Sequence, residues 1–422
     1  MTSLLKLKHI HPGLVQSWPG SKLRQVSVDR ATPGSQSSLR EANRARLVDA
    51  IKRFGAITQV ELAGATGLST ATVSTIVKEL VAAGVLMTAP VSRSGRRAQQ
   101  VSLARQLGMV AGVHFSQRML RIELADMAGT VVATQHMPLP YEHRADTGMD
   151  RAARLIHDMV ESVGATPEEL LGVGLAVAAP VDVRTGLLSV RGVLRGWDEV
   201  DIPGSFSRRI GKPVWIDNDA NLAIVAEHRY GAAQGCDAAV FVAIGHGVGA
   251  GLLVDGCVVR GHGGMAGEIG HVRVVENGRV CVCGNRGCLE TVVNSGVLVE
   301  TLRATHGNLA LRDIIAKALA GDVGCTRVVA DSGEHVGAAV AALCNVFNPQ
   351  RVVVGGILGT AGEIALAPLR ATVARASLAS QFAELDVVQS TLGEAAEVRG
   401  AVALALDSVA LPIGTLEVAH VY

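Results

Sequence analysis

Residues 268–290 read EIGHVRVVENGRVCVCGNRGCLE, and this short stretch carries four metal-binding side chains: His271, Cys281, Cys283 and Cys288. One imidazole and three thiolates form the closed tetrahedral ligand set of a structural zinc site. The spacing His-x9-Cys-x-Cys-x4-Cys allows one loop to supply every ligand. Buried free thiols beside an unrelated histidine are the alternative, but three cysteines so close together are hard to explain as packing. We therefore expect a structural zinc ion in this loop.

Glycines and carboxylates accompany the expected ligands. Gly284 and Gly287 lie between the thiols, where a chain that wraps a metal needs dihedral angles that other residues rarely adopt. Glu268 and Glu290 stand at the two ends of the stretch. A metal that fixes the loop also fixes these two carboxylates, so we expect the metal to organise a binding site beside it.

Upstream of this loop, the segment before residue 104 predicts three helices. The first is expected over residues 38–54, and Thr58 with Glu61 forms a capping-box pattern before the second. A turn at Gly67 leads to a third helix over residues 69–84. Its apolar positions fall on one face, which we expect to pack inward: Val73, Ile76, Val77 and Leu80.

Two short strands, residues 85–87 and 100–103, then flank a basic tip at residues 94–97. This order of elements is typical of a winged helix-turn-helix, whose third helix enters the major groove of DNA. Small side chains there allow close approach to base edges, and arginines of the tip contact phosphates or a minor groove. The residues expected to bind DNA are Thr70, Ala71, Thr72, Ser74, Thr75, Arg96 and Arg97.

Charge supports the same interpretation. Residues 1–107 hold 15 Lys and Arg against 5 Asp and Glu, a net charge of +10, while the remainder carries −9. A basic segment attached to an acidic body indicates a polyanionic partner such as double-stranded DNA. A small helical domain that binds protein is the alternative. Proline, glycine and serine interrupt any period in residues 1–37, which we expect to be a disordered tail.

The rest of the chain alternates strands and helices, which predicts an α/β class. Glycine-rich turns follow two of the strands, and this repetition indicates two lobes around a cleft. Residues 109–139 are expected to form two strands around a turn at 127–129. Further strands are expected at 172–178, 213–217, 238–244 and 351–354, and helices at 149–163, 218–229, 296–305, 311–320, 335–347 and from about 394 to 406.

Four segments resemble the ROK family of bacterial sugar kinases and sugar-responsive repressors. They are EIGHV...CVCGNRGCLE, IDNDAN at 216–221, GHGVGAGLLVDG at 245–256 and NPQRVVVGG at 348–356. The resemblance covers about nine-tenths of the chain. It implies a two-lobed actin-like, ribonuclease-H-like domain over residues 108–410 behind a winged helix-turn-helix at 38–104. It also implies a homodimer or homotetramer with a sugar bound between the lobes.

By this resemblance the sugar-binding residues are Asn218, Asp219, Glu268, His271 and Glu290. Carboxylates and an amide accept from and donate to several hydroxyls at once, which suits a sugar. One nitrogen of His271 is expected on zinc and the other towards the pocket. A helix N-cap is the alternative role for Asn218 and Asp219.

The resemblance fails at the phosphate-binding loop. Kinases of the family carry D-x-G-G-T-K after a strand near residue 111, where this chain reads AGVHFSQRMLRI. His246 replaces a threonine of the second loop, and Ile357 replaces a glycine of the third. We therefore predict a repressor released by a sugar or sugar derivative. The alternatives are a sugar kinase with Asp219 as catalytic base, and a repressor released by a partner protein.

Other features set limits on where the protein acts. No apolar run is long enough to span a membrane. Lys6 and Lys8 are not followed by an apolar run with a cleavage site, so we expect no signal peptide. The remaining cysteines, Cys236, Cys257, Cys325 and Cys344, are scattered and form no disulfide framework. These features predict a cytoplasmic protein.

Overall fold

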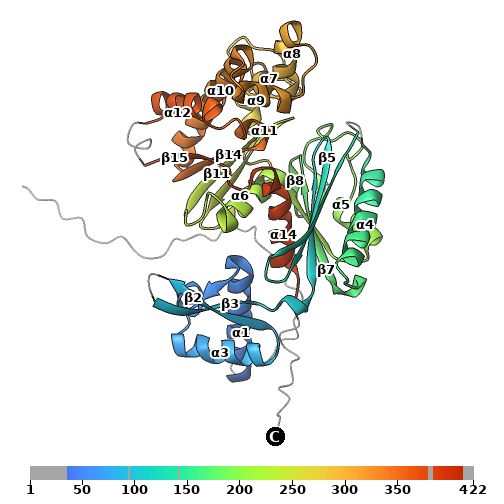
Figure 1. Cartoon of the computed structure of the whole chain (residues 1–422), viewed down its shortest axis with the longest axis vertical. Coiled ribbons are helices and arrows are strands. Elements are labelled where there is room, and N and C mark those ends of the chain that lie inside the picture. The colour runs from blue at the N-terminus through green and yellow to red at the C-terminus, as the bar shows by residue number, and fades with distance from the viewer. Residues whose placement is uncertain (1–35, 94–95, 141–142, 379–383, 412–422) are drawn as a thin grey trace, which may run out of the picture.

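The computed structural model describes residues 36–93, 96–140, 143–378 and 384–411 and shows a small head beneath two larger lobes (Figure 1). The expected tail, residues 1–37, lies almost wholly outside the described residues. Within the described ranges, no helix combines the length and the apolar character needed to cross a membrane.

The head consists of α1 (Gln36–Phe54), β1 (Ile57–Thr58), α2 (Gln59–Thr66), α3 (Thr70–Ala82), β2 (Leu86–Arg93) and β3 (Arg96–Leu103). Its strands pair in the order β1-β3-β2, which confirms the winged helix-turn-helix. The predicted capping box joins Thr58 and Glu61, and Ser69 caps α3. The wing strands are longer than predicted: β2 continues through Pro90, which is tolerated because β2 is an edge strand.

Helix α3 buries the four residues expected to pack inward, Val73, Ile76, Val77 and Leu80. They share one core with Leu47, Val48 and Ile51 of α1. Glu79 on α3 accepts hydrogen bonds from Arg40 and from Arg44, the latter at 2.6 Å. These contacts join α1 and α3 into one rigid unit.

Lobe I is built on a five-stranded sheet of order β10-β7-β4-β5-β6. Helices α4 and α5 cover one face of this sheet, and α14 covers the other (Figure 1). The elements are η1 (Arg105–Leu107), β4 (Met109–Phe115), β5 (Met119–Asp126), β6 (Val131–Pro138), α4 (Ala145–Ser162), η2 (Pro167–Glu169), β7 (Leu170–Val177), β8 (Val181–Asp182), β9 (Leu187–Leu188), α5 (Ile202–Ile210), β10 (Val214–Asn218) and α14 (Ala396–Ser408).

Lobe II repeats this plan on a sheet of order β13-β12-β11-β14-β15. In each sheet three strands run parallel and continue into an antiparallel hairpin, as an actin-like fold requires. The elements are α6 (Asp219–Tyr230), β11 (Ala238–Ile244), β12 (Val248–Val254), β13 (Cys257–Val258), η3 (Ile269–His271), α7 (Glu290–Val293), α8 (Ser295–His306), α9 (Leu311–Leu319), α10 (Val323–Phe347), β14 (Arg351–Gly355), α11 (Gly356–Gly359), α12 (Glu363–Ala376), β15 (Asp386–Gln389) and η4 (Gly393–Ala395).

Two predictions about these lobes were wrong, and some helices were not predicted. Residues 109–139 form three strands, because a tight turn at Ser116–Met119 divides the first of the two expected. Helix α10 begins at Val323, twelve residues before the predicted start, and α12 was not predicted. Glycines weaken the helical pattern of α10, yet Gly333 and Gly337 lie directly against the backbone of α12. The close packing of α10 against α12 therefore outweighed the low helix propensity of these glycines.

Helices α6 and α14 connect the two lobes by packing closely against each other. A Cβ atom at Gly400 of α14 would overlap the carbonyl oxygen of Leu222 on α6. Gly174 of β7 similarly lets the backbone of α14 approach the sheet of lobe I. The relative position of the lobes therefore depends on glycines at these crossings.

We expect Gly400→Ala to destabilise the protein by about 1–3 kcal/mol, because the added methyl group forces the two helices apart. The measurement is the free energy of unfolding from urea denaturation. Gly64→Ala is the matched control, since Gly64 is inside α2 with open space around it. That change should be neutral or stabilise by up to about 1 kcal/mol through helix propensity. Equal effects at the two positions would contradict close α6–α14 packing.

Candidate functional site

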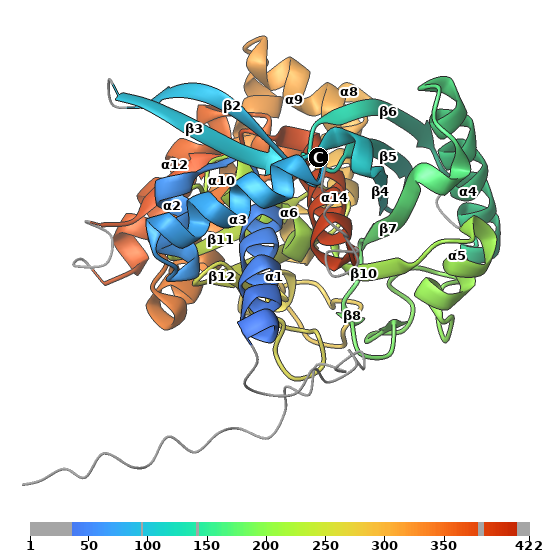
Figure 2. The same cartoon turned by 90° about the horizontal axis from the view of Figure 1, so that it is seen from below.

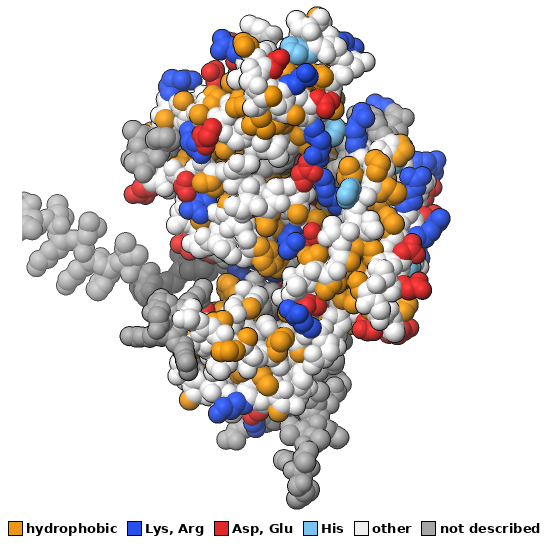
Figure 3. All heavy atoms as spheres, viewed as in Figure 1, with side chains coloured by type: hydrophobic (Ala, Val, Ile, Leu, Met, Phe, Trp, Pro, Cys, Tyr) orange, Lys and Arg blue, Asp and Glu red, His pale blue; other side chains and the backbone are white. Residues whose placement is uncertain are grey.

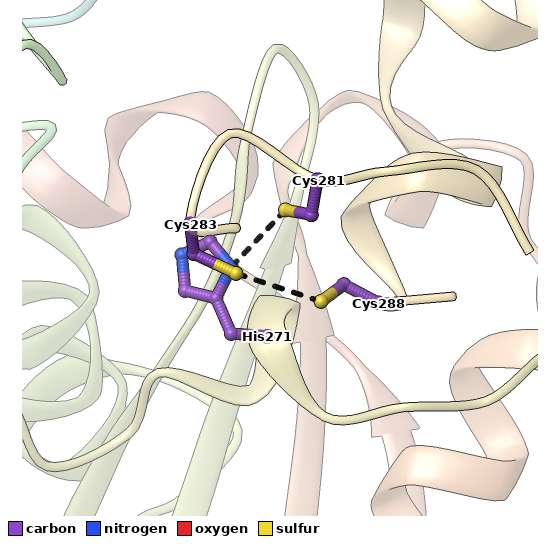
Figure 4. Close-up of side chains that lie close together, drawn as sticks. All are labelled: His271, Cys281, Cys283 and Cys288. Carbon is purple, nitrogen blue, oxygen red and sulfur yellow. Dashed lines mark hydrogen bonds between the residues drawn. The ribbon is translucent and has the colours of Figure 1, made fainter. Parts of the chain in front are cut away.

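The four expected metal ligands lie close together (Figure 4). His271 Nδ1 lies 3.5 Å from Cys281 Sγ, and Cys283 Sγ lies 3.7 Å from Cys288 Sγ. All four ligand atoms are within 4.8 Å of one another. A tetrahedral zinc ion with Zn–S bonds of ~2.3 Å places its sulfur ligands roughly 3.8 Å apart. The cluster therefore has the donors and the dimensions of a metal site.

The loop is folded tightly enough to hold this cluster. Isolated bridges pair Arg273 with Cys288 and Val280 with Arg286. Gly284 and Gly287 have φ values of +89° and +70°, as predicted from their positions. A side chain at Gly287 would overlap the carbonyl oxygen of Val275, so the second turn of the loop needs glycine.

The thiols are poorly suited to ionise by themselves. Burial, followed by hydrogen bonding of its thiol to Cys283 and Cys281, raises the pKa of Cys288 to about 12. Burial also raises the pKa of Cys281, whereas hydrogen bonding to Asn285 lowers that of the exposed Cys283. A bound divalent cation would supply the positive charge that three neighbouring thiolates require.

The second nitrogen of His271 faces two carboxylates. Its Nε2 atom lies 3.9 Å from Glu268 Oε2 and 4.0 Å from Glu290 Oε2. Glu268 immediately precedes η3 and Glu290 begins α7, so both carboxylates belong to elements that the cysteine loop joins. One imidazole thus lies between the thiol cluster and the carboxylates.

Asp219, at the start of α6, lies near enough to Glu268 for its charge to act on that carboxyl. Burial, followed by the charges of Asp219 and Glu290, raises the pKa of Glu268 to about 7. Burial also raises the pKa of Glu290. Near neutral pH, Glu268 is therefore both a donor and an acceptor, which suits recognition of hydroxyl groups.

Asn218 is the N-cap of α6, the alternative role that the sequence left open for it. Its side-chain oxygen accepts from Asn221 N at 3.2 Å, and its amide donates to Ala179 O at 3.1 Å. Asp219 Oδ1 accepts from Ala220 N at 2.8 Å, while Oδ2 lies 3.6 Å from His114 Nε2. The side-chain oxygen and amide of Asn218 are thus both used within the protein.

Two residues of the same motif, Asp217 and Asn221, position this turn and were not identified from the sequence. Asp217 is 1% exposed, accepts from Asn218 N and Asn221 Nδ2, and forms an ion pair with Arg260 at 2.6 Å. The motif IDNDAN contained both residues, but the partner Arg260 follows β13 more than forty positions later. No spacing in the sequence indicated that contact.

His114 also adjoins the site and was not predicted. Its Nε2 atom lies 3.6 Å from Asp219 Oδ2, and the residue is 4% exposed. Within the described residues, neither ring nitrogen has a hydrogen-bond partner. Glu397, at the start of α14, is buried nearby, and burial raises its pKa. His114 lies near the end of β4, just before the turn to β5.

The carboxylate of Glu394 bridges the two lobes. Glu394 of η4 forms ion pairs with Arg121 of β5 in lobe I and with Arg312 of α9 in lobe II. Figure 3 shows Lys and Arg side chains gathered along the groove between the two lobes. Burial, followed by the charges of Arg118 and Arg312, lowers the pKa of His246 in this region. The groove is consequently cationic.

The expected DNA-binding residues lie on the head, away from the carboxylates. Thr70, Ala71 and Thr75 are exposed on α3, and Thr72 and Ser74 are half-buried. Thr75 donates to Ala71 O at 3.0 Å, and Thr72 contacts Ser69 Oγ at 2.8 Å. Arg96 and Arg97 begin β3, and their side chains lie outside the described residues.

Curated relatives match almost the full length of the chain. It is 26% identical over 374 residues to the xylose repressor of Bacillus subtilis (strain 168), covering 88% of this chain and 97% of that protein. It is 27% identical over 381 residues to the DNA-binding transcriptional dual regulator NagC of Escherichia coli (strain K12), covering 86% and 93%.

Solved structures show the same architecture. A ROK family transcriptional regulator, described as a homologue of the E. coli MLC protein, superposes with a TM-score of 0.72 at 24% identity, covering 88% of this chain and 96% of that one. A ROK family glucokinase from Streptomyces griseus, in complex with glucose and AMPPNP, gives a TM-score of 0.64 at 27% identity, covering 71% and 99%. The kinase therefore matches much less of this chain than the regulator does.

Two family models match different parts of the chain. Residues 41–97 match the MarR family, which agrees with the winged helix seen in the head. Residues 110–408 match the ROK family, and this match spans both lobes, the cysteine loop and the carboxylate site. Because it covers well over half of the sequence, the chain belongs to the ROK family.

Proposed function

We propose that this protein is a DNA-binding transcriptional repressor that is released from its operator by a sugar or sugar derivative. The observation that carries this proposal is one chain that joins a winged helix-turn-helix to a partly buried group of carboxylates, Asp219, Glu268 and Glu290. The repressor relatives share this full length. Binding to DNA places the protein in the cytoplasm.

The turn between β4 and β5 supports sensing over phosphoryl transfer. Ser116 Oγ accepts from Met119 N at 3.0 Å and from Arg118 N at 3.4 Å. Backbone N–H groups that a kinase would offer to a phosphate are thus bound within the turn. His114 further supports this interpretation, because a histidine beside Asp219 replaces the acidic residue that begins the kinase motif.

We assign a structural zinc ion to His271, Cys281, Cys283 and Cys288. All four protein ligands would be used, so the ion has no open position for catalysis. Its role is to fix η3 and α7, and with them Glu268 and Glu290. His271 would bind the metal through Nδ1 and orient its Nε2 towards the carboxylates and a sugar hydroxyl.

Release would follow from a population shift. A sugar that contacts both Asp219 and the carboxylates of the cysteine loop binds more tightly when the lobes are closed, and it therefore favours that form. In a homodimer, two α3 helices would contact half-sites about 34–36 Å apart, or multiples of this distance. A change in the placement of the heads would then weaken operator binding.

The direct test is a thermal-shift screen with xylose, glucose, N-acetylglucosamine and their phosphorylated forms, followed by operator binding. The operator can be selected by the protein from random-sequence duplexes. A sugar that raises the melting temperature should also weaken binding to the selected duplex. A protein that selects no duplex, or whose duplex affinity is unaffected by every stabilising sugar, would contradict the proposal.

Asp219→Asn should lower sugar affinity about 10- to 100-fold, because it removes a charged acceptor worth roughly 1.5–3 kcal/mol. Duplex affinity without sugar should be unchanged. Calorimetry measures the sugar affinity, and fluorescence anisotropy measures the duplex affinity.

A coupled assay with ATP and the same sugars decides against the kinase alternative if no turnover is seen. Turnover that disappears in Asp219→Asn would overturn the repressor assignment in favour of a kinase.

Cys281→Ala and Cys288→Ala should each lose the zinc ion and, with it, the sugar response, because the loop organises Glu268 and Glu290. Metal content is measured on the purified proteins. Cys344→Ala is the control, since this thiol is buried in another part of lobe II. Stoichiometric zinc in both loop variants would show that the ligand assignment is wrong.

Arg96→Ala and Arg97→Ala should weaken duplex binding and reduce its dependence on salt. The slope of log K against log salt falls in magnitude by about 0.9 for every phosphate that an arginine no longer neutralises. Arg303→Ala, on α8 of lobe II, is the control for a general loss of positive charge. An unchanged slope in the double variant would remove the wing from the DNA interface.

A further inference from the structure

The last turn of α1 in the head binds both lobes through two neighbouring residues. Lys52 Nζ donates to the carbonyl oxygen of Val409, the residue that follows α14 in lobe I. Arg53 Nη2 donates to the carbonyl oxygen of Asp255 at 2.9 Å, in the β12–β13 turn of lobe II. Consecutive residues of one helix are therefore anchored to different bodies.

These two anchors differ in kind. Lys52 is 9% exposed, and apolar residues around it form one continuous core between the head and lobe I, including Val110, Met127 and Leu406. Arg53 is exposed and reaches lobe II by polar contacts alone, including Cys257 Sγ at 3.9 Å. The head is consequently held by lobe I through an apolar core and contacts lobe II through polar groups at the end of α1, so a movement between the lobes acts on these polar contacts, the Arg53 contact among them.

The turn in lobe II is shaped to accept Arg53. Gly256 has a φ of +68°, and a Cβ atom there would lie 2.5 Å from Arg53 Nη2. Asp255 N donates to Asp237 O at 2.6 Å and ties the turn to the segment before β11. A side chain at position 256 would displace the guanidinium, so glycine keeps this contact possible.

Helix α6 brings a third contact to the same place. Arg229 near its end donates to Lys52 O at 3.3 Å and forms an ion pair with Asp407 of α14. The other end of α6 begins with Asp219, and twelve residues of helix span about 18 Å. Helix α14 runs beside it from Glu397, near Asp219, to Val409. Both helices therefore extend from the carboxylate site to the end of α1.

A movement of α1 is passed on to the DNA-binding helix. The two helices share the core of the head, and Arg44 joins Glu79 between them. Seen from below, α1 lies across the junction beside α14, with α3 in front (Figure 2). A tilt of the last turn of α1 therefore reorients α3 without unfolding the head.

We propose that Lys52 and Arg53 are positioning residues that convert a movement between the lobes into a reorientation of α3. This inference rests on the proposed sugar-released repressor, since it names the contacts through which the two sites communicate. The free energy of coupling would reside partly in the Arg53–Asp255 contact, because it is made to lobe II in one relative position of the lobes.

Two variant and control pairs test this inference in the full-length protein. Arg53→Ala removes the contact, and Arg46→Ala removes the same charge from an exposed position of the same helix. Gly256→Ala displaces Arg53 without changing charge. Gly235→Ala introduces the same strain at a φ of +76° in open space. For each protein, duplex affinity is measured with and without saturating xylose, glucose and N-acetylglucosamine, and sugar affinity is measured without DNA.

We expect Arg53→Ala and Gly256→Ala to bind sugar within twofold of the wild type, while the sugar-induced change in duplex affinity falls at least fivefold. Both controls should keep the full change. A sugar-induced change equal to the wild type in both variants would overturn the inference and leave the proposed function intact.

A second experiment needs no sugar. Amide hydrogen exchange should be faster at residues 50–54 and 255–258 in Arg53→Ala than in Arg46→Ala. Equal exchange there overturns the inference even if the wild type responds to no sugar.

Discussion

The close packing of α6 against α14 is the constraint on which the arrangement of this molecule depends. Gly400 allows the two helices to cross with the backbone of one against the carbonyl oxygen of Leu222 on the other. One helix belongs to lobe II and the other covers the sheet of lobe I, so their contact sets the angle between the lobes. Packed helices adopt discrete arrangements and do not deform continuously, which makes this crossing suitable for switching.

The chemistry of the site follows from what lies at one end of this helix pair. Asp219 begins α6, and the cysteine loop holds Glu268 and Glu290 opposite to it. Burial, together with repulsion from the neighbouring carboxylates Asp219 and Glu290, raises the pKa of Glu268. A ligand that carries several hydroxyl groups relieves this by donating to some oxygens and accepting from a protonated one. A metal at His271 would keep the carboxylates in place during such an exchange.

The same scaffold is found in a ROK transcriptional regulator and in a ROK glucokinase. In this chain Ser116 accepts from backbone N–H groups of the β4–β5 turn, and His114 adjoins Asp219. Glu394 joins Arg121 and Arg312 across the groove. On the proposed function, these contacts occupy groups that nucleotide binding would use, while Asp219, Glu268 and Glu290 stay available to a sugar. A head attached to lobe I would then respond to a movement between the lobes.

The sequence by itself determined the elements whose pattern is local. The winged helix-turn-helix followed from caps, a glycine turn and an apolar face of period 3.6, and the cysteine cluster followed from four ligands within one loop. Glycine positions also predicted the unusual dihedral angles at Gly284 and Gly287. Such features depend on residues close together in the chain, so spacing alone describes them.

Only the tertiary structure decided the contacts between distant segments. It brought His114 to Asp219, Arg260 to Asp217, and Arg53 to the turn at Asp255, each pair separated by more than forty residues. It also extended α10 through glycines that disfavour a helix, because α12 packs against them. In each case the free energy comes from burial or pairing with a partner that the local sequence does not contain, and no pattern within a short window records it.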